Sequence, residues 1–149
     1  MKKMMLFAAS FGSMLILGAC TTTQSISGQN NLQILQNKNW ILAQIGSQPI
    51  RYNAEKTPAT LQFSADHQRL SGFDGCNRIM GAYQADQKNL NIGQVASTRM
   101  ACLDNHQIDI AYQQALTQVK QYQVNHQELN LLDAQGNVVL KLVSPIQPR

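Results

Sequence analysis

The chain has 149 residues, of which 12 are Lys or Arg and 8 are Asp or Glu, and its formal net charge is +4. Residues 1–19 contain two of the lysines, so the rest of the chain has a net charge of only +2. It has no basic run interleaved with aromatic residues, which excludes nucleic acid as an expected partner. The remaining 130 residues suit one domain with one hydrophobic core.

The first 19 residues have the pattern of a secretory signal peptide. A basic start at Lys2 and Lys3 is followed by an apolar run over residues 4–17 and then by small residues. This run is shorter than the ~20 apolar residues of a membrane-spanning helix. Its end, Leu17-Gly18-Ala19-Cys20, resembles the lipobox of bacterial lipoproteins. That resemblance implies cleavage before Cys20 and acylation of this cysteine; the alternative is an ordinary signal peptide with an incidental cysteine.

The residue after the cysteine bears on localisation. Thr21, and not Asp, follows Cys20, which in lipoproteins implies sorting to the outer membrane. We therefore expect a lipid-anchored protein of the cell envelope, in the outer membrane and facing the periplasm. The small polar residues after Cys20 predict a lipid-anchored tether over residues 20–38, with Leu32, Ile34 and Leu35 beginning or capping the fold.

Short apolar runs separated by turn residues predict about seven strands. Their connections are short, which favours antiparallel pairing. The Asp74-Gly75 pair predicts a type I′ hairpin turn, which needs positive φ at both residues. Trp40, the only tryptophan, is expected to fill the core; an exposed binding residue is the alternative. The predicted strands include Asn39–Ile45, Thr60–Ser64, Arg69–Phe73, Asn89–Val95, Tyr122–Val124, Glu128–Leu132 and Val138–Val143.

One segment has a helical period instead. Ile108, Tyr112, Ala115 and Val119 recur at spacings of four, three and four, which predicts an amphipathic helix within residues 104–122. We interpret this stripe as core that covers an open face of the sheet. The sequence thus predicts a mainly β (α+β) fold: a curled antiparallel sheet or partly closed barrel of about seven strands, with one amphipathic helix packed on it.

Two cysteines remain if Cys20 is acylated. Cys76 and Cys102 would be exported to a compartment where disulfides persist, and only one intramolecular pairing is open to them. Two free thiols are the alternative. A zinc site needs three or four ligands, and the chain has neither a CxxC nor an HxxxH spacing. We therefore expect no metal and no cofactor.

The residues around these cysteines form a pattern. It is approximately G-x-x-G-C-N-x-x-x-G-x-Y followed by T-x-M-x-C, with a tryptophan near the start of the domain. Its members here are Trp40, Gly72, Gly75, Cys76, Asn77, Gly81, Tyr83, Thr98, Met100 and Cys102. This pattern resembles the META domain of HslJ-like proteins over residues 39–143, which leaves residues 144–149 as a C-terminal tail.

The resemblance implies a compact antiparallel β structure, often barrel-like, with a helix packed against it. It also implies a small exported or lipid-anchored envelope protein, and it supplies no catalytic residue set. We interpret the motif as architectural: the glycines occupy positions that a Cβ would strain, Asn77 satisfies backbone groups of the loop, and Tyr83 fills core. A binding surface formed by the motif is the alternative.

We expect a non-enzymatic, monomeric lipoprotein that is held at the membrane by its lipid. By binding an unidentified envelope protein it would support envelope integrity or tolerance of stress and antibiotics. The chain has no GxSxG, paired-carboxylate or phosphate-loop motif, and we interpret Asp74, Asp104 and Glu128 as turn, cap and surface residues. One alternative is an inhibitor of a lysozyme or protease that acts through residues 74–78 or 48–57. The other is a binder of a small apolar ligand inside the sheet.

Overall fold

The computed structural model describes residues 26–36, 38–54, 56–100 and 106–145. No helix among these residues is long and apolar enough to cross a membrane. In chain order the elements are α1 (Ile26–Leu35), β1 (Asn39–Ile45), β2 (Gln48–Pro49), β3 (Thr60–Ser64), the 3-10 helix η1 (Asp66–Gln68), β4 (Arg69–Phe73), β5 (Arg78–Ala85), β6 (Leu90–Ile92), β7 (Ala96–Ser97), α2 (His106–Gln118), β8 (Gln121–Val124), β9 (Glu128–Leu132) and β10 (Val138–Val143).

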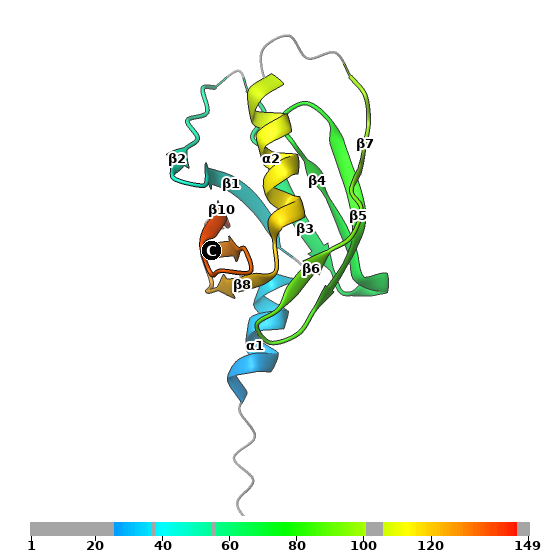
Figure 1. Cartoon of the computed structure of the whole chain (residues 1–149), viewed down its shortest axis with the longest axis vertical. Coiled ribbons are helices and arrows are strands. Elements are labelled where there is room, and N and C mark those ends of the chain that lie inside the picture. The colour runs from blue at the N-terminus through cyan, green and yellow to red at the C-terminus, as the bar shows by residue number, and fades with distance from the viewer. Residues whose placement is uncertain (1–25, 37, 55, 101–105, 146–149) are drawn as a thin grey trace, which may run out of the picture.

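The strands form one antiparallel sheet in the order β6-β5-β4-β3-β1-β10-β9-β8, with β2 paired to β1 and β7 paired to β5 (Figure 1). The two ends of this sheet meet. The Leu90 amide donates to the carbonyl of Lys120 over 3.0 Å, and the Tyr122 amide donates to the carbonyl of Lys88 over 2.9 Å. The sheet is therefore a nearly closed barrel, which confirms the predicted class and leaves little free edge.

The inside of the barrel is filled by side chains. Strand residues alternate between its two faces, so that Leu61 and Phe63 of β3 are fully buried while Gln62 between them is exposed. Phe63 and Tyr83 meet edge to face, with 5.1 Å between their ring centres. This filled interior argues against the alternative of a small apolar ligand inside the sheet.

Helix α2 packs against β1 and β10 and runs along the long axis of the molecule (Figure 1). Tyr112, Ala115 and Val119 of the predicted apolar stripe are buried, and Ile108 packs against the same core. Leu116, which the stripe did not include, is also fully buried. The apolar stripe of α2 therefore belongs to the hydrophobic core, which confirms the prediction from its spacing.

Helix α1 lies within residues 20–38, for which the sequence predicts a tether whose last apolar residues begin or cap the fold. Leu35 is fully buried, and the indole Nε1 of Trp40 donates a 2.9 Å hydrogen bond to the Leu35 carbonyl. The domain therefore begins before residue 39. Apart from Ile26, the large apolar residues of α1 lie at its C-terminal end, so the sequence has no helical period that would predict this helix. The part of the tether before residue 26 lies outside the described residues.

The strand count is also higher than the seven or so predicted. Two of the ten strands, β2 and β7, contain only two residues each, too few to leave a pattern in the sequence. The strand predicted over Asn89–Val95 ends at Ile92. There the Gly93 amide turns to donate a 2.9 Å hydrogen bond to the carbonyl of Ala82.

Candidate functional site

The connection between β4 and β5 contains the centre of the sequence motif, and it is not the predicted type I′ turn. Phe73 pairs with Arg78, so four residues, 74–77, join the strands. Gly75 has a φ of 99°, but Asp74 does not have positive φ. The Asp74 amide donates to the carbonyl of Asn77 over 3.0 Å. The reason for the wider loop is the Asp74 side chain, which turns inward.

Asp74 is fully buried, and its carboxylate is hydrogen-bonded on both oxygens. Oδ1 accepts from the backbone amides of Cys76 over 2.9 Å and Asn77 over 2.6 Å. Oδ2 accepts from Nε2 of Gln113 in α2 over 2.6 Å. A buried carboxylate needs such partners, because removing it from water is otherwise costly. The sequence interpretation of Asp74 as an ordinary turn residue therefore missed its role in joining the hairpin to α2.

Tyr112 lies beside this carboxylate in the core. Its hydroxyl donates a 3.2 Å hydrogen bond to the carbonyl of Thr60 in β3. Burial raises the pKa of Tyr112 far above its usual value, and nearby Tyr52 and Asp74 raise it further. The phenol consequently stays neutral and keeps donating to β3 at every physiological pH.

Asn77 ties the hairpin loop to the segment that precedes Cys102. Its Oδ1 accepts from the Met100 amide over 2.8 Å and from the Thr98 hydroxyl over 3.3 Å. The same hydroxyl oxygen accepts from the Arg78 amide over 3.1 Å. The Met100 side chain is 64% exposed, so in this motif position the backbone makes the contact.

Cys76 is 4% exposed, and its Sγ lies 3.6 Å from the Met100 carbonyl oxygen. This contact brings the sulfur close to a residue two positions before Cys102. Cys102 itself lies outside the described residues, as do Cys20 and Asp104. The Cys76–Cys102 disulfide and the acylation of Cys20 therefore remain predictions.

Tyr83 and Trp40 lie in the core rather than on a binding surface. The Tyr83 hydroxyl donates to the Ser64 carbonyl over 3.0 Å and accepts from Nε2 of Gln36 over 2.8 Å. Burial raises the pKa of Tyr83, against a smaller lowering by Gln36. Through this hydroxyl the residues that follow α1 are joined to β3 and β5.

The motif glycines Gly72 and Gly81 lie where the backbone of another strand or loop approaches. A Cβ at Gly72 would collide with the Thr60 carbonyl oxygen across the β3–β4 pair. A Cβ at Gly81 would lie 2.9 Å from the carbonyl oxygen of Gln94. The positions of Gly72 and Gly81 thus fit the architectural interpretation of these two motif residues.

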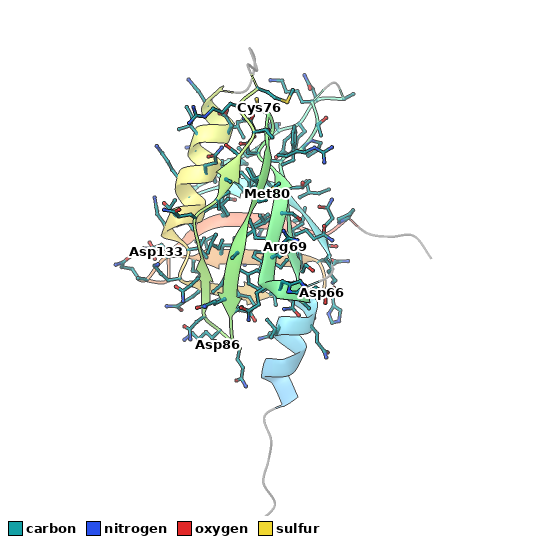
Figure 2. All side chains as sticks on the ribbon, turned by 90° about the vertical axis from the view of Figure 1, so that its right-hand side faces the viewer. Asp66, Arg69, Cys76, Met80, Asp86 and Asp133 are labelled. Carbon is teal, nitrogen blue, oxygen red and sulfur yellow. The ribbon has the colours of Figure 1, made fainter. Side chains whose placement is uncertain are left out.

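The outside of β3, β4 and β5 is an exposed surface that faces the viewer in Figure 2, and no other described element lies over it there. We call it the outer face; strand pairing arranges it as three rows of three residues, one residue from each strand. Its only apolar side chain of large exposure is Met80, which is 57% exposed at the centre of β5. The rows are Ser64, Arg69 and Ala82; Gln62, Ser71 and Met80; and Thr60, Phe73 and Arg78.

Two open hollows meet on the outer face. One has a volume of about 500 Å³ and is lined by Arg78, Phe73 and neutral polar residues. The other has about 650 Å³, is lined by Arg69, Met80 and Gln94, and has a mainly apolar wall. Ser71 lines both, so the two hollows adjoin at the middle of the outer face and follow one another along the strands.

Comparison with known families gives a match to the META domain over residues 33–145. This chain belongs to the META domain family. The match begins before residue 39, in agreement with the contribution of Leu35 to the core. Among curated proteins, none matches the sequence.

Solved structures resemble this META domain in fold. An NMR structure of a protein from Burkholderia xenovorans has 31% sequence identity and a TM-score of 0.59, and the match covers 77% of this chain and 86% of that one. A second NMR structure has 23% identity and a TM-score of 0.58, with 74% and 92% of the two chains covered. A DUF4847 family protein from Bacteroides vulgatus has 18% identity and a TM-score of 0.55, with 78% and 98% covered. The last two likenesses concern the fold alone.

Two further sequence predictions concern the loop over residues 74–78, one of the two loops considered for a hydrolase inhibitor, and the surface residue Glu128. In the loop over residues 74–78, Asp74, Cys76 and Asn77 are buried, so this loop presents few side chains to the active site of a hydrolase. Within the described ranges, no three His, Cys, Asp or Glu side chains lie close enough to hold a metal ion. Glu128 lies at the surface, where it forms a 2.9 Å ion pair with Lys141. Exposed residues of the other loop, such as Gln48 and Arg51, leave the inhibitor alternative open, and the outer face is a second candidate site.

Proposed function

We propose that this META domain protein is a non-enzymatic lipoprotein of the envelope that binds a protein partner through its outer face. The exposed Met80 carries this proposal, because it lies at the centre of a nine-residue face that no other element of the described residues covers. Met80 also lines the hollow of about 650 Å³ whose wall is mainly apolar, and an apolar surface rimmed by polar residues is typical of interaction sites. Partner binding here would support envelope integrity under stress or antibiotic exposure.

The position of the lipid supports binding close to a membrane. Six residues lead from Cys20 to the first residue of α1, a reach of at most about 21 Å. A lipid on Cys20 would therefore keep the domain beside the outer membrane, on its periplasmic side. Replacing Cys20 by Ser is expected to abolish labelling with a radioactive fatty acid and to move the protein from the membrane to the soluble fraction. Labelling that persists in C20S contradicts the anchor.

The binding function is tested by affinity capture from chemically crosslinked envelopes, with two matched variants. Met80→Glu puts a charge on the outer face. Ile110→Glu makes the same change at an apolar side chain of α2 that is 54% exposed. We expect the wild type and I110E to enrich the same envelope protein and to restore growth of a deletion strain under detergent or antibiotic stress, and M80E to do neither. Equal behaviour of the two variants, or no enriched protein, contradicts the proposal.

A further inference from the structure

The outer face carries positive charge without negative charge. Arg69 and Arg78 are both exposed, and the nine residues of the face include no Asp or Glu. In the part of the chain that the structure describes, neither guanidinium has a hydrogen bond or an ion pair. Guanidinium groups bind carboxylates through paired hydrogen bonds, so these two are available for an acidic ligand.

The two arginines have a defined spacing. Arg69 pairs with Ala82, and Arg78 lies four residues before Ala82 on β5. At about 3.3 Å per residue this places them about 13 Å apart along the strand direction. The row of Ser71 and Met80 lies halfway between them, and Figure 2 shows Met80 above Arg69 on this face.

An extended peptide has the same spacing. Its residues i, i+2 and i+4 point to one side, and i and i+4 are also about 13 Å apart. We propose, on the basis of the proposed function, that the outer face binds an extended segment of the partner that carries acidic residues at i and i+4 and an apolar residue at i+2. The two carboxylates bind Arg69 and Arg78, and the apolar side chain contacts Met80, whose flexible thioether adapts to different shapes.

The hollows fit this occupant. Each arginine lines one of them, and the shared Ser71 gives a continuous path for a chain lying along the strands. Neutral polar side chains, Gln62 and Gln94, flank that path and can bond to the backbone of the segment. A surface with charge at both ends and an apolar centre thus selects by the spacing of the acidic residues and not by charge alone.

The test uses fluorescent peptides of about ten residues and the full-length protein in neutral detergent, with binding followed by anisotropy. One peptide has Glu at i and i+4 and Leu at i+2. The register control has the same composition with Glu at i and i+3, so that its carboxylates point to opposite sides. We expect the first peptide to bind on the order of tenfold more tightly than the control. Equal affinity, or no binding of either peptide, overturns the inference.

Variants separate this site from general charge attraction. Arg69→Glu and Arg78→Glu are each expected to weaken binding at least about tenfold. Lys88→Glu makes the same change of charge at an exposed turn and is expected to leave affinity unchanged. Equal loss in all three variants overturns the inference. Binding to phosphatidylglycerol vesicles is measured for the same variants. If R69E and R78E lose binding to the vesicles but still bind the peptide, the occupant is a lipid surface and the inference is also overturned.

The outcome is distinguishable from that of the proposed function. If the peptides fail while M80E still loses the captured envelope protein, the outer face is a partner site of different chemistry. If M80E and I110E behave alike in capture, the proposed function fails whatever the peptides do.

Discussion

Nε2 of Gln113 donates a 2.6 Å hydrogen bond to Oδ2 of Asp74, 39 positions earlier in the chain. This bond joins the middle of α2 to the β4–β5 loop at the end of the barrel that carries Cys76 (Figures 1 and 2). It also leaves Oδ1 free to accept from the two loop amides. The conformation of the motif loop therefore depends on the helix that follows it.

Asp74→Ala is expected to lower the free energy of unfolding by about 3 to 5 kcal/mol, because it leaves buried donors without an acceptor. Asp74→Asn keeps the Oδ1 acceptor, and the Gln113 amide can turn to accept from the new Nδ2, so its cost is expected to be smaller. Urea denaturation followed by circular dichroism measures both. Equal costs for the two variants would show that Asp74 acts through its charge and not through these hydrogen bonds.

The Asp74–Gln113 contact itself is tested by Gln113→Glu. When Asp74 is present, the Gln113→Glu variant places two carboxylates against each other in a largely buried site and is expected to be strongly destabilising. In the Asp74→Asn background the new carboxylate at position 113 accepts from Nδ2 of the introduced asparagine, and most of the loss is expected to disappear. Gln114→Glu, one position along α2 and exposed, is the control and is expected to change stability little in either background.

The sequence predicts features of this fold that depend on local period and fails where partners are distant. The stripe of α2 and the alternation in β3 follow from spacing alone, and both are confirmed. The burial of Asp74 depends on Gln113, which no local pattern indicates. Helix α1 contributes the buried Leu35, whose carbonyl accepts from Trp40, and its own sequence has no helical period. The outer face requires the register of three strands, which the sequence does not specify.

Gly72→Ala is expected to destabilise the protein by about 3 kcal/mol or more, because the new Cβ collides with the Thr60 carbonyl oxygen and must push β3 and β4 apart. Gly93→Ala is the matched comparison. A Cβ there would lie 3.3 Å from the Ala82 carbonyl oxygen, a tight contact that small shifts relieve. Its expected cost is about 1 kcal/mol. Thermal unfolding of the two variants measures the difference, and a mild effect of G72A would contradict an architectural role for this glycine.

The predicted Cys76–Cys102 disulfide closes a loop of 27 residues. In the chain-entropy account such a link stabilises by about 3 kcal/mol, and reduction or the double replacement by Ser is expected to remove that amount. Peptide mapping of unreduced protein should join the Cys76 and Cys102 peptides. Alkylation of both thiols in freshly exported, unreduced protein would refute the link.

Tyr122 is expected to make stability depend on pH in the alkaline range. Burial, with smaller contributions from Asp86 and Tyr83, raises its pKa from 10.0 to about 12, and its hydroxyl donates to the Asp86 carbonyl over 2.8 Å. The unfolded chain loses this proton near pH 10, while the folded protein keeps it until about pH 12. The stabilisation by the neutral phenol is therefore fully present below pH 10 and falls as pH rises from 10 to 12.

Tyr122→Phe removes both the hydrogen bond and the titration. At pH 8 the variant is expected to be about 1 kcal/mol less stable than the wild type. Between pH 10 and 12 the gap should shrink, because only the wild type loses stability through this group. Thr117→Val removes a 2.7 Å hydrogen bond to the Gln114 carbonyl that does not titrate, so its gap should stay constant with pH. Urea denaturation at several pH values between about 8 and 11.5 measures both gaps. A constant gap for Y122F would mean that the folded protein does not hold this proton more tightly than the unfolded chain.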